Sequence, residues 1–101
     1  MSADSYIIDG ITFTFRKYGR VVIVTSSGIP TSPIPTNASA GNVTIADKYR
    51  PVAAAICHVM ATNSIAFQMN IGTSGMFQIG YAEEALSGAN VRVCMTYISA
   101  S

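Results

Sequence analysis

Short runs in which apolar and polar residues alternate are the feature that most constrains how this chain folds. Residues 11–15 read Ile-Thr-Phe-Thr-Phe, and in residues 64–71 apolar side chains again occupy every second position. Side chains point alternately to the two faces of a β-strand, so this spacing gathers the apolar residues on one face. We therefore expect half-buried strands, with Phe13 in the first run and Phe67 in the second facing a core.

Glycine-containing turns separate these runs. Tyr18 and Gly19 precede a β-branched run at residues 20–25, and the turn from Gly72 to Gly75 precedes another strand-like run. Two such runs around a short turn are typical of a β-hairpin. The sequence predicts strands within residues 11–15, 20–25, 43–46, 52–60, 64–71, 76–81 and 90–98. The expected fold class is all-β, a small antiparallel β-barrel or sandwich of six or seven strands, jelly-roll or Greek-key-like.

The length of 101 residues suits one domain and is too short for two. Within a single β domain over residues 1–101, we expect residues 1–8 to form an N-terminal arm. Residues 26–41 are proline-rich, and each proline removes a backbone donor and fixes its φ angle. This segment is either a recognition loop or a crossover between sheets, and we favour the crossover.

Charge is scarce in this sequence. Charged residues make up 11% of the chain, against about 25% in a typical soluble domain, and the net charge is +1. This balance argues against nucleic acid as a partner, since a nucleic-acid-binding protein carries a basic face. The longest apolar run, residues 52–57, is far shorter than the roughly 18 residues of a membrane span, so no membrane insertion is expected. Residues 1–6 lack the pattern of a secretory signal.

The few titratable side chains give little support to catalysis or metal binding. Cys57 and Cys94 form either one disulfide or two free buried thiols, and we favour free thiols because no secretory signal is evident. His58 directly follows Cys57, and neighbours on a strand point to opposite faces, so the two are poorly placed to share a metal. Glu83 and Glu84 are adjacent and not opposed across a cleft. We expect no enzyme, no metal and no cofactor, and we assign His58 no chemistry.

Neutral polar side chains on the predicted strands are the best binding candidates. Gln68 and Asn70 are two residues apart, so both project from the same face of one strand. Arg92 is expected to face outward on the last strand, where its guanidinium supplies a fork of donors. Amides and an arginine suit the hydroxyl groups of a saccharide. The plainer interpretation is a solvated polar strand face.

The order of these features resembles the C-terminal head domain of receptor-binding proteins in the baseplates of siphophages that infect lactococci and related Gram-positive bacteria. The resemblance lies in three segments. Residues 9–19 read Asp-Gly-Ile-Thr-Phe-Thr-Phe-Arg-Lys-Tyr-Gly, residues 49–51 read Tyr-Arg-Pro before a strand, and residues 66–79 read Ala-Phe-Gln-Met-Asn-Ile-Gly-Thr-Ser-Gly-Met-Phe-Gln-Ile. In order of features it covers roughly residues 8–98, although no single motif is as specific as a P-loop.

The resemblance implies a homotrimer of small β-barrel heads at the tip of the phage tail, which binds saccharides of the host cell wall near the contacts between protomers. Relatives carry a His-x-Asp pair, then a Trp, and an Arg on a later strand. The corresponding ligand-binding positions here are Gln68, Asn70, Ile79 and Arg92. Only the arginine matches, and loss of the aromatic residue removes a stacking surface. The implied location is the virion, after synthesis in the bacterial cytoplasm, and other baseplate or tail proteins are implied partners.

A trimer agrees with the shortage of charge, since part of the surface would be covered by other copies. Residues 21–24 are apolar at every position, which suggests burial on both faces or a protomer contact. We expect Val21, Val22, Ile23 and parts of the proline-rich segment to contribute to this contact.

Two further interpretations remain open. The chain is alternatively a structural trimerisation domain of a tail fibre or baseplate that binds no sugar, and the departures at Gln68, Asn70 and Ile79 favour that alternative. It is also compatible with an unrelated β-sandwich binding module. Binding to cell-wall polysaccharide separates the first alternative from an adhesion head.

Overall fold

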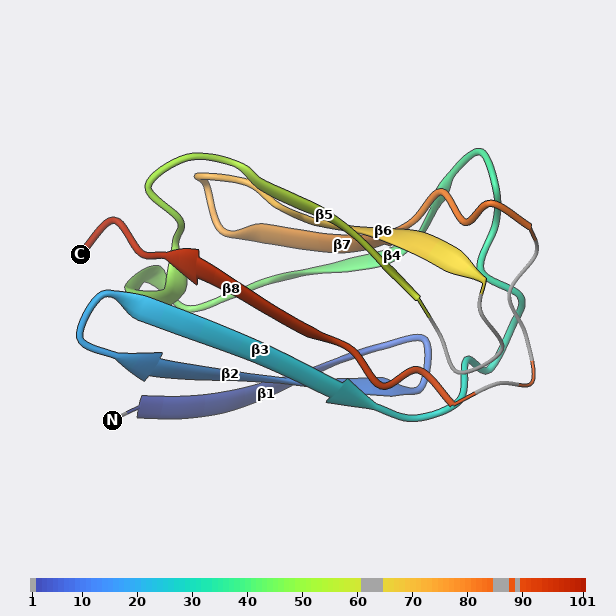
Figure 1. Cartoon of the computed structure of the whole chain (residues 1–101), viewed down its shortest axis with the longest axis horizontal. Helices are drawn as coiled ribbons and strands as arrows, with labels where there is room; N and C mark the ends of the chain where they lie inside the picture. The colour runs from blue at the N-terminus through green and yellow to red at the C-terminus, as the bar shows by residue number, and fades with distance from the viewer. Residues whose placement is uncertain (1, 61–64, 85–87, 89) are drawn as a thin grey trace.

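The computed structural model describes residues 2–60, 65–84, 88 and 90–101. The described chain forms eight strands and one short 3₁₀ turn (Figure 1). The strands are β1 (Ser2–Ile8), β2 (Ile11–Tyr18), β3 (Val21–Ser27), β4 (Ser39–Thr44), β5 (Ala55–Met60), β6 (Ala66–Ile71), β7 (Met76–Gly80) and β8 (Cys94–Ile98), and the turn is η1 (Asp47–Tyr49).

The strands form two antiparallel four-stranded sheets that face each other as a sandwich (Figure 1). The first sheet has the order β1-β2-β3-β8, and the second has the order β4-β7-β6-β5. In the second sheet, β5, β6 and β7 follow one another as hairpins and β4 returns to pair with β7, which is Greek-key topology. The predicted all-β sandwich is therefore confirmed.

The first sheet extends further than expected. Residues 2–8, which we expected to form an arm, make strand β1 in continuous antiparallel register with β2. Burial alternates along this segment, but its inward positions are not all apolar, because Asp4 occupies one of them beside Tyr6 and Ile8. Side-chain bonds hold the strand in place: the Tyr6 hydroxyl accepts a hydrogen bond from the Ala46 N–H at 2.9 Å. This additional strand raises the number above the predicted six or seven.

The proline-rich segment connects the two sheets, as expected. It leaves β3 in the first sheet and enters β4, an edge strand of the second. Its Pro30 and Ile34 are buried, so the segment covers one end of the core. Where it joins β4, the chain approaches Gly80 so closely that a Cβ atom there would lie 2.7 Å from the Cα atom of Ser39. Glycine at this position therefore lets β4 pair with β7.

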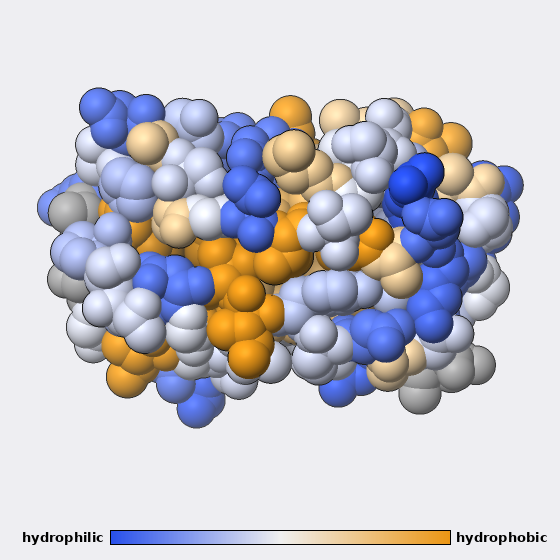
Figure 2. All heavy atoms as spheres, turned by 180° about the vertical axis from the view of Figure 1, so that it is seen from behind, coloured by the Kyte–Doolittle hydropathy of each residue, from blue (hydrophilic) through white to orange (hydrophobic). Residues whose placement is uncertain are grey.

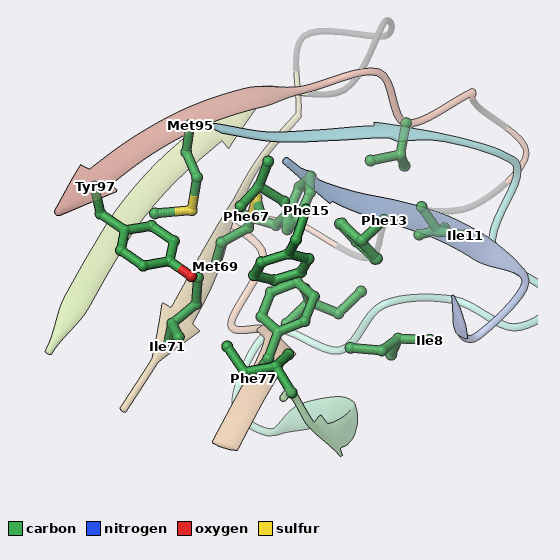
Figure 3. Packing of buried hydrophobic residues seen from close by; sticks show 14 of the residues in the cluster. Ile8, Ile11, Phe13, Phe15, Phe67, Met69, Ile71, Phe77, Met95 and Tyr97 are labelled. Atoms are coloured by element: carbon green, nitrogen blue, oxygen red, sulfur yellow. The ribbon is translucent and has the colours of Figure 1, made fainter. Parts of the chain in front are cut away.

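One hydrophobic core fills the space between the sheets (Figure 3). At its centre, Phe15 from the first sheet meets Phe77 from the second edge-to-face, with ring centroids 5.3 Å apart. Phe13 meets the same Phe77 ring at 4.9 Å. Such arrangements are favoured because the positive edge of one ring approaches the negative face of another. The alternation predicted for residues 11–15 and 64–71 is confirmed in the described residues, and Ser64 lies outside them.

Polar bonds close the side of the sandwich where β1 and β4 lie. The buried Tyr49 donates its phenol hydrogen to the Asp4 carboxylate at 2.6 Å, and the Lys48 ammonium lies 3.2 Å from the same oxygen. These hydrogen bonds, that of Tyr49 first, hold the pKa of Asp4 below its usual range, whereas burial and the bond to Asp4 raise the pKa of Tyr49.

Figure 2, which views the molecule from behind, shows apolar residues gathered along the middle between hydrophilic ones.

Candidate functional site

The two sheets differ in charge. Asp4, Arg16 and Lys17 lie on strands of the first sheet. The four strands of the second sheet, β4 to β7, contain no aspartate, glutamate, lysine or arginine. Among their outward side chains, the imidazole of His58 is the one group that is neither apolar nor a hydroxyl or amide. A ligand of the outer face of the second sheet would have to be recognised by neutral groups.

Amide side chains form a row across this outer face. Asn70 on β6 is the register partner of Gln78 on β7, and Gln78 is the partner of Asn42 on β4. Directly opposed residues in an antiparallel pair have Cβ atoms about 4.5–5.5 Å apart, so the three amides are neighbours. Asn70 and Gln78 are half-buried and Asn42 is exposed. We call Asn42, Gln78 and Asn70 the amide row.

Gln68 lies beside the amide row on the same face. It follows the alternation of β6, two residues before Asn70, and is half-buried. Its register partners are His58 on β5, whose side chain is exposed, and Gly80 on β7, which has no side chain. The sequence prediction that Gln68 and Asn70 share a face is thus consistent with the structure, which adds Gln78, Asn42 and His58 as neighbours.

Within the described part of the chain, the structure records no side-chain hydrogen bond for Asn42, Gln68, Asn70 or Gln78. Each side chain offers two donor hydrogens and an acceptor oxygen. Gln68, Asn70 and Gln78 are half-buried, which restricts the motion of their side chains while leaving the polar ends accessible. This arrangement suits a ligand that has both donors and acceptors.

Apolar side chains flank the amide row. Ile56 on β5 is the register partner of Asn70 and is 56% exposed. Met60 on the same strand and Met76 on β7 are also exposed and share the outward alternation. The outer face of the second sheet therefore combines amides with apolar contact surface, and its strands contribute no aspartate, glutamate, lysine or arginine. The Glu83 carboxylate lies at the start of β6, where it accepts a hydrogen bond from the Ala66 N–H at 2.9 Å.

Ile79 and Arg92 lie elsewhere. Ile79 is 1% exposed and pairs with the buried Met69, so it belongs to the core on the opposite face of the sheet from Gln68 and Asn70. The prediction that Ile79 contacts a ligand is wrong for the isolated chain, because strand alternation directs Gln78 outward and Ile79 inward. The residue that does face outward, Gln78, directly precedes Ile79. The alternation of apolar and polar residues in 76–81 is the sequence signal that could have identified Gln78.

Arg92 belongs to the first sheet's side of the sandwich. The neighbouring Val91 and Val93 are bonded to β3, through Val91 N–H to Gly28 O at 2.7 Å and Ser26 N–H to Val93 O at 3.1 Å. Both valines face the core, so the exposed Arg92 points away from the core, as predicted. It does not lie on the last strand as expected, because β8 begins only at Cys94. Because the outer faces of the two sheets look in opposite directions, one chain does not bring Arg92 to Gln68 and Asn70.

A groove of about 620 Å³ lies between the edge strands β5 and β8 and is lined by residues 52–57 and 94–98. Cys57 and Cys94 both line it, and both are free thiols, as expected. Both were also expected to be buried, but Cys57 is only half-buried and Cys94 is exposed. In the described ranges, no group of three or more His, Cys, Asp or Glu residues is placed to hold a metal ion.

An apolar patch adjoins this groove on the first sheet. Tyr18, Val21 and Ile98 are register neighbours on β2, β3 and β8, and the Val52 N–H donates to the Ile98 carbonyl at 3.0 Å. All four side chains are exposed, Val52 by 60%. We call Tyr18, Val21, Ile98 and Val52 the apolar corner. Val22, expected at a protomer contact, is instead fully buried in the chain's own core.

Comparison with known proteins identifies no family for the chain. No protein-family model matches it, and no curated protein is similar to it at a significant level. Among the described residues, no helix is long and apolar enough to cross a membrane.

Proposed function

We propose that the chain is a non-enzymatic saccharide-binding module, the head domain of a phage receptor-binding protein that attaches a virion to host cell-wall saccharide. The observation that carries the binding proposal is the outer face of the second sheet, whose strands lack aspartate, glutamate, lysine and arginine. Within the described residues, no side-chain hydrogen bond engages Gln68 or the amide row there. The phage context rests on the resemblance of residues 9–19, 49–51 and 66–79, and the sandwich fold is compatible with it.

A saccharide matches this face better than the other ligand classes do. Sugar hydroxyls both donate and accept hydrogen bonds, as amides do, and the C–H faces of sugar rings pack on apolar side chains such as Ile56. Nucleic acid and other polyanions need lysine or arginine, which the strands of the second sheet lack. The half-buried side chains of Gln68, Asn70 and Gln78 reduce the entropy lost when a ligand orders them.

Binding to purified cell-wall polysaccharide, measured by calorimetry, tests the proposal. Gln68→Ala and Asn70→Ala should each weaken binding about two- to twelve-fold, because each removes a neutral hydrogen-bonding group. Thr12→Ala is the matched control, since Thr12 is half-buried on the outer face of the first sheet. Failure of the unaltered chain to bind any wall polysaccharide would favour the alternative, a trimerisation domain without sugar binding.

The homotrimer is part of the same proposal, and the apolar corner supports it. Exposed apolar residues that adjoin one another are unusual on a monomer and mark contact surfaces. Light scattering should give three times the 10.6 kDa mass of one chain at micromolar concentration. Val21→Glu and Ile98→Glu should return the mass to that of one chain, because each would bury an unpaired carboxylate in the contact. A wild-type monomer contradicts this part of the proposal.

Arg92 distinguishes two versions of the saccharide site. If each chain binds sugar alone, Arg92→Ala leaves the affinity unchanged, because Arg92 faces away from Gln68 and Asn70. If the site lies between protomers, as the resemblance implies, Arg92 of a second copy reaches the amides and Arg92→Ala weakens binding. In that case the monomeric Val21→Glu variant should show the same loss as Arg92→Ala.

A further inference from the structure

The direction of the amide row limits the kind of saccharide that fits it. Asn70, Gln78 and Asn42 lie at one register level on three neighbouring strands, so a line through them runs across the strands. Neighbouring strands are about 4.8 Å apart, a spacing comparable to the length of one sugar ring in an extended glycan. An extended glycan laid along this line would place successive rings over successive amides.

The two ends of the amide row differ in chemistry, and the strands at both ends contain no aspartate, glutamate, lysine or arginine. At one end, Ile56 on edge strand β5 continues the same register level with an exposed apolar side chain. At the other end, the exposed Asn42 lies on β4, which is the opposite edge strand of the sheet. Together with Ile56, the amide row spans the sheet from one edge strand to the other, as a binding surface for an internal stretch of polymer would.

An alternative orientation along β6 uses fewer groups. Along that strand the outward residues are Ala66, Gln68 and Asn70, and only the last two carry polar side chains. Beside Gln68, the register position on β7 is Gly80, which provides no side-chain contact. The cross-strand direction engages three amides and an apolar residue, so it provides more contacts to an extended ligand.

We infer that the amide row binds an internal segment of a linear, uncharged polysaccharide, which lies across β6, β7 and β4 with about one sugar unit over each amide. This inference rests on the proposed saccharide-binding function and goes beyond it by naming the ligand's charge, shape and orientation. It also assigns binding roles to Gln78 and Asn42, which lie on different strands from Gln68 and Asn70.

The test is an array of linear bacterial-wall oligosaccharides, neutral and phosphate-bearing, graded in length from one to six sugar units. We expect neutral oligomers to bind, with affinity that rises from one unit to three or four and then levels off. Gln78→Ala and Asn42→Ala should each reduce the affinity for the longer oligomers about two- to twelve-fold, while Thr12→Ala has no effect. Gln78→Thr removes the same amide but keeps a residue that favours β-strands, so it should fold and show the same reduction in affinity.

The outcomes separate this inference from the proposed function. If single sugars bind as tightly as longer oligomers, or if phosphate-bearing oligomers bind preferentially, the inference is wrong while saccharide binding stands. If no saccharide binds, both fail. If Gln78→Ala changes the mass in solution and leaves sugar binding unchanged, the outer face of the second sheet is a contact between proteins and the inference is overturned.

Discussion

The outer faces of the two sheets use polar side chains in different ways. On the first sheet, polar groups bond to each other across strands: Ser5 and Thr14 hydroxyls lie 3.1 Å apart, and Arg16 donates to Thr25 Oγ1 at 3.0 Å. On the second sheet, the amide row and Gln68 have no such bonds in the described chain. Both faces satisfy the same period-two pattern, so the pattern alone does not tell a self-satisfied surface from an available one.

The difference teaches where to look for function in a β-sandwich with little charge. Cross-strand bonds between polar side chains stabilise a sheet modestly and occupy the groups that make them. Polar groups without such bonds, held partly buried by their neighbours, are left for solvent or a ligand. The following predictions test whether the two sheets differ only on their outer faces.

The largest effect should come from the shared core, where the difference between the sheets disappears. Phe15→Ala in the first sheet and Phe77→Ala in the second should each lower the free energy of unfolding by about 3–5 kcal/mol, because each leaves a cavity in a fully packed region. Urea unfolding, followed by circular dichroism and tyrosine fluorescence, should show one transition for both variants. Ile7→Ala, an exposed position, is the control. A stable remnant of one sheet would show that the sheets fold separately.

A smaller effect is expected where a polar bond links β8 to η1. The Tyr97 hydroxyl donates to the Tyr49 carbonyl at 2.5 Å inside the core, and burial raises the pKa of Tyr97. Tyr97→Phe should lower the free energy of unfolding by about 1–3 kcal/mol, because the buried carbonyl loses its partner. The same urea assay measures it. Tyr18→Phe, which alters an exposed tyrosine of the same sheet, should change stability little; equal effects of the two substitutions would contradict the argument.

The next prediction concerns pH and the polar bonds of β1. The pKa of Asp4 is lowered in the folded protein by Tyr49 and then Lys48, so its contribution to stability is present above the pKa of the unfolded chain, about 4. That contribution is lost as the pH falls through the folded value. Tyr49→Phe should therefore destabilise the protein more at pH 7 than at pH 2. A difference in unfolding free energy that does not depend on pH would show that Asp4 is not responsible.

Much of the fold follows from the sequence because alternation and turn residues act locally. The core positions of Phe13 and Phe67, the β2–β3 hairpin and the crossover were predicted on that basis. Strand β1 was missed although it pairs with β2 across the two-residue turn Asp9-Gly10, in which both residues have positive φ angles, and Asp-Gly is itself a local hairpin signal. Local patterns do not reveal the additional bonds from Tyr49 and Ala46, which lie far along the chain.

The candidate site was only partly predictable for the same reason. Gln68 and Asn70 share a strand, so their common face follows from spacing. Gln78 and Asn42 join them only through the register of β7 and β4. Ile79 was assigned by correspondence with a family, and that correspondence did not take account of the strand's alternation, which places it in the core.

The smallest effect on stability should come from charges added to the two outer faces, and here the sheets should differ in binding alone. Thr12→Lys on β2 and Gln78→Lys on β7 both place a lysine at a half-buried, outward position of a central strand. Each should change the free energy of unfolding by about 0.5 kcal/mol or less, since long side chains reach solvent. Polysaccharide binding measured by calorimetry should persist in Thr12→Lys and be lost in Gln78→Lys, because only the latter alters the amide row. Loss of binding in Thr12→Lys would instead place the binding surface on the first sheet.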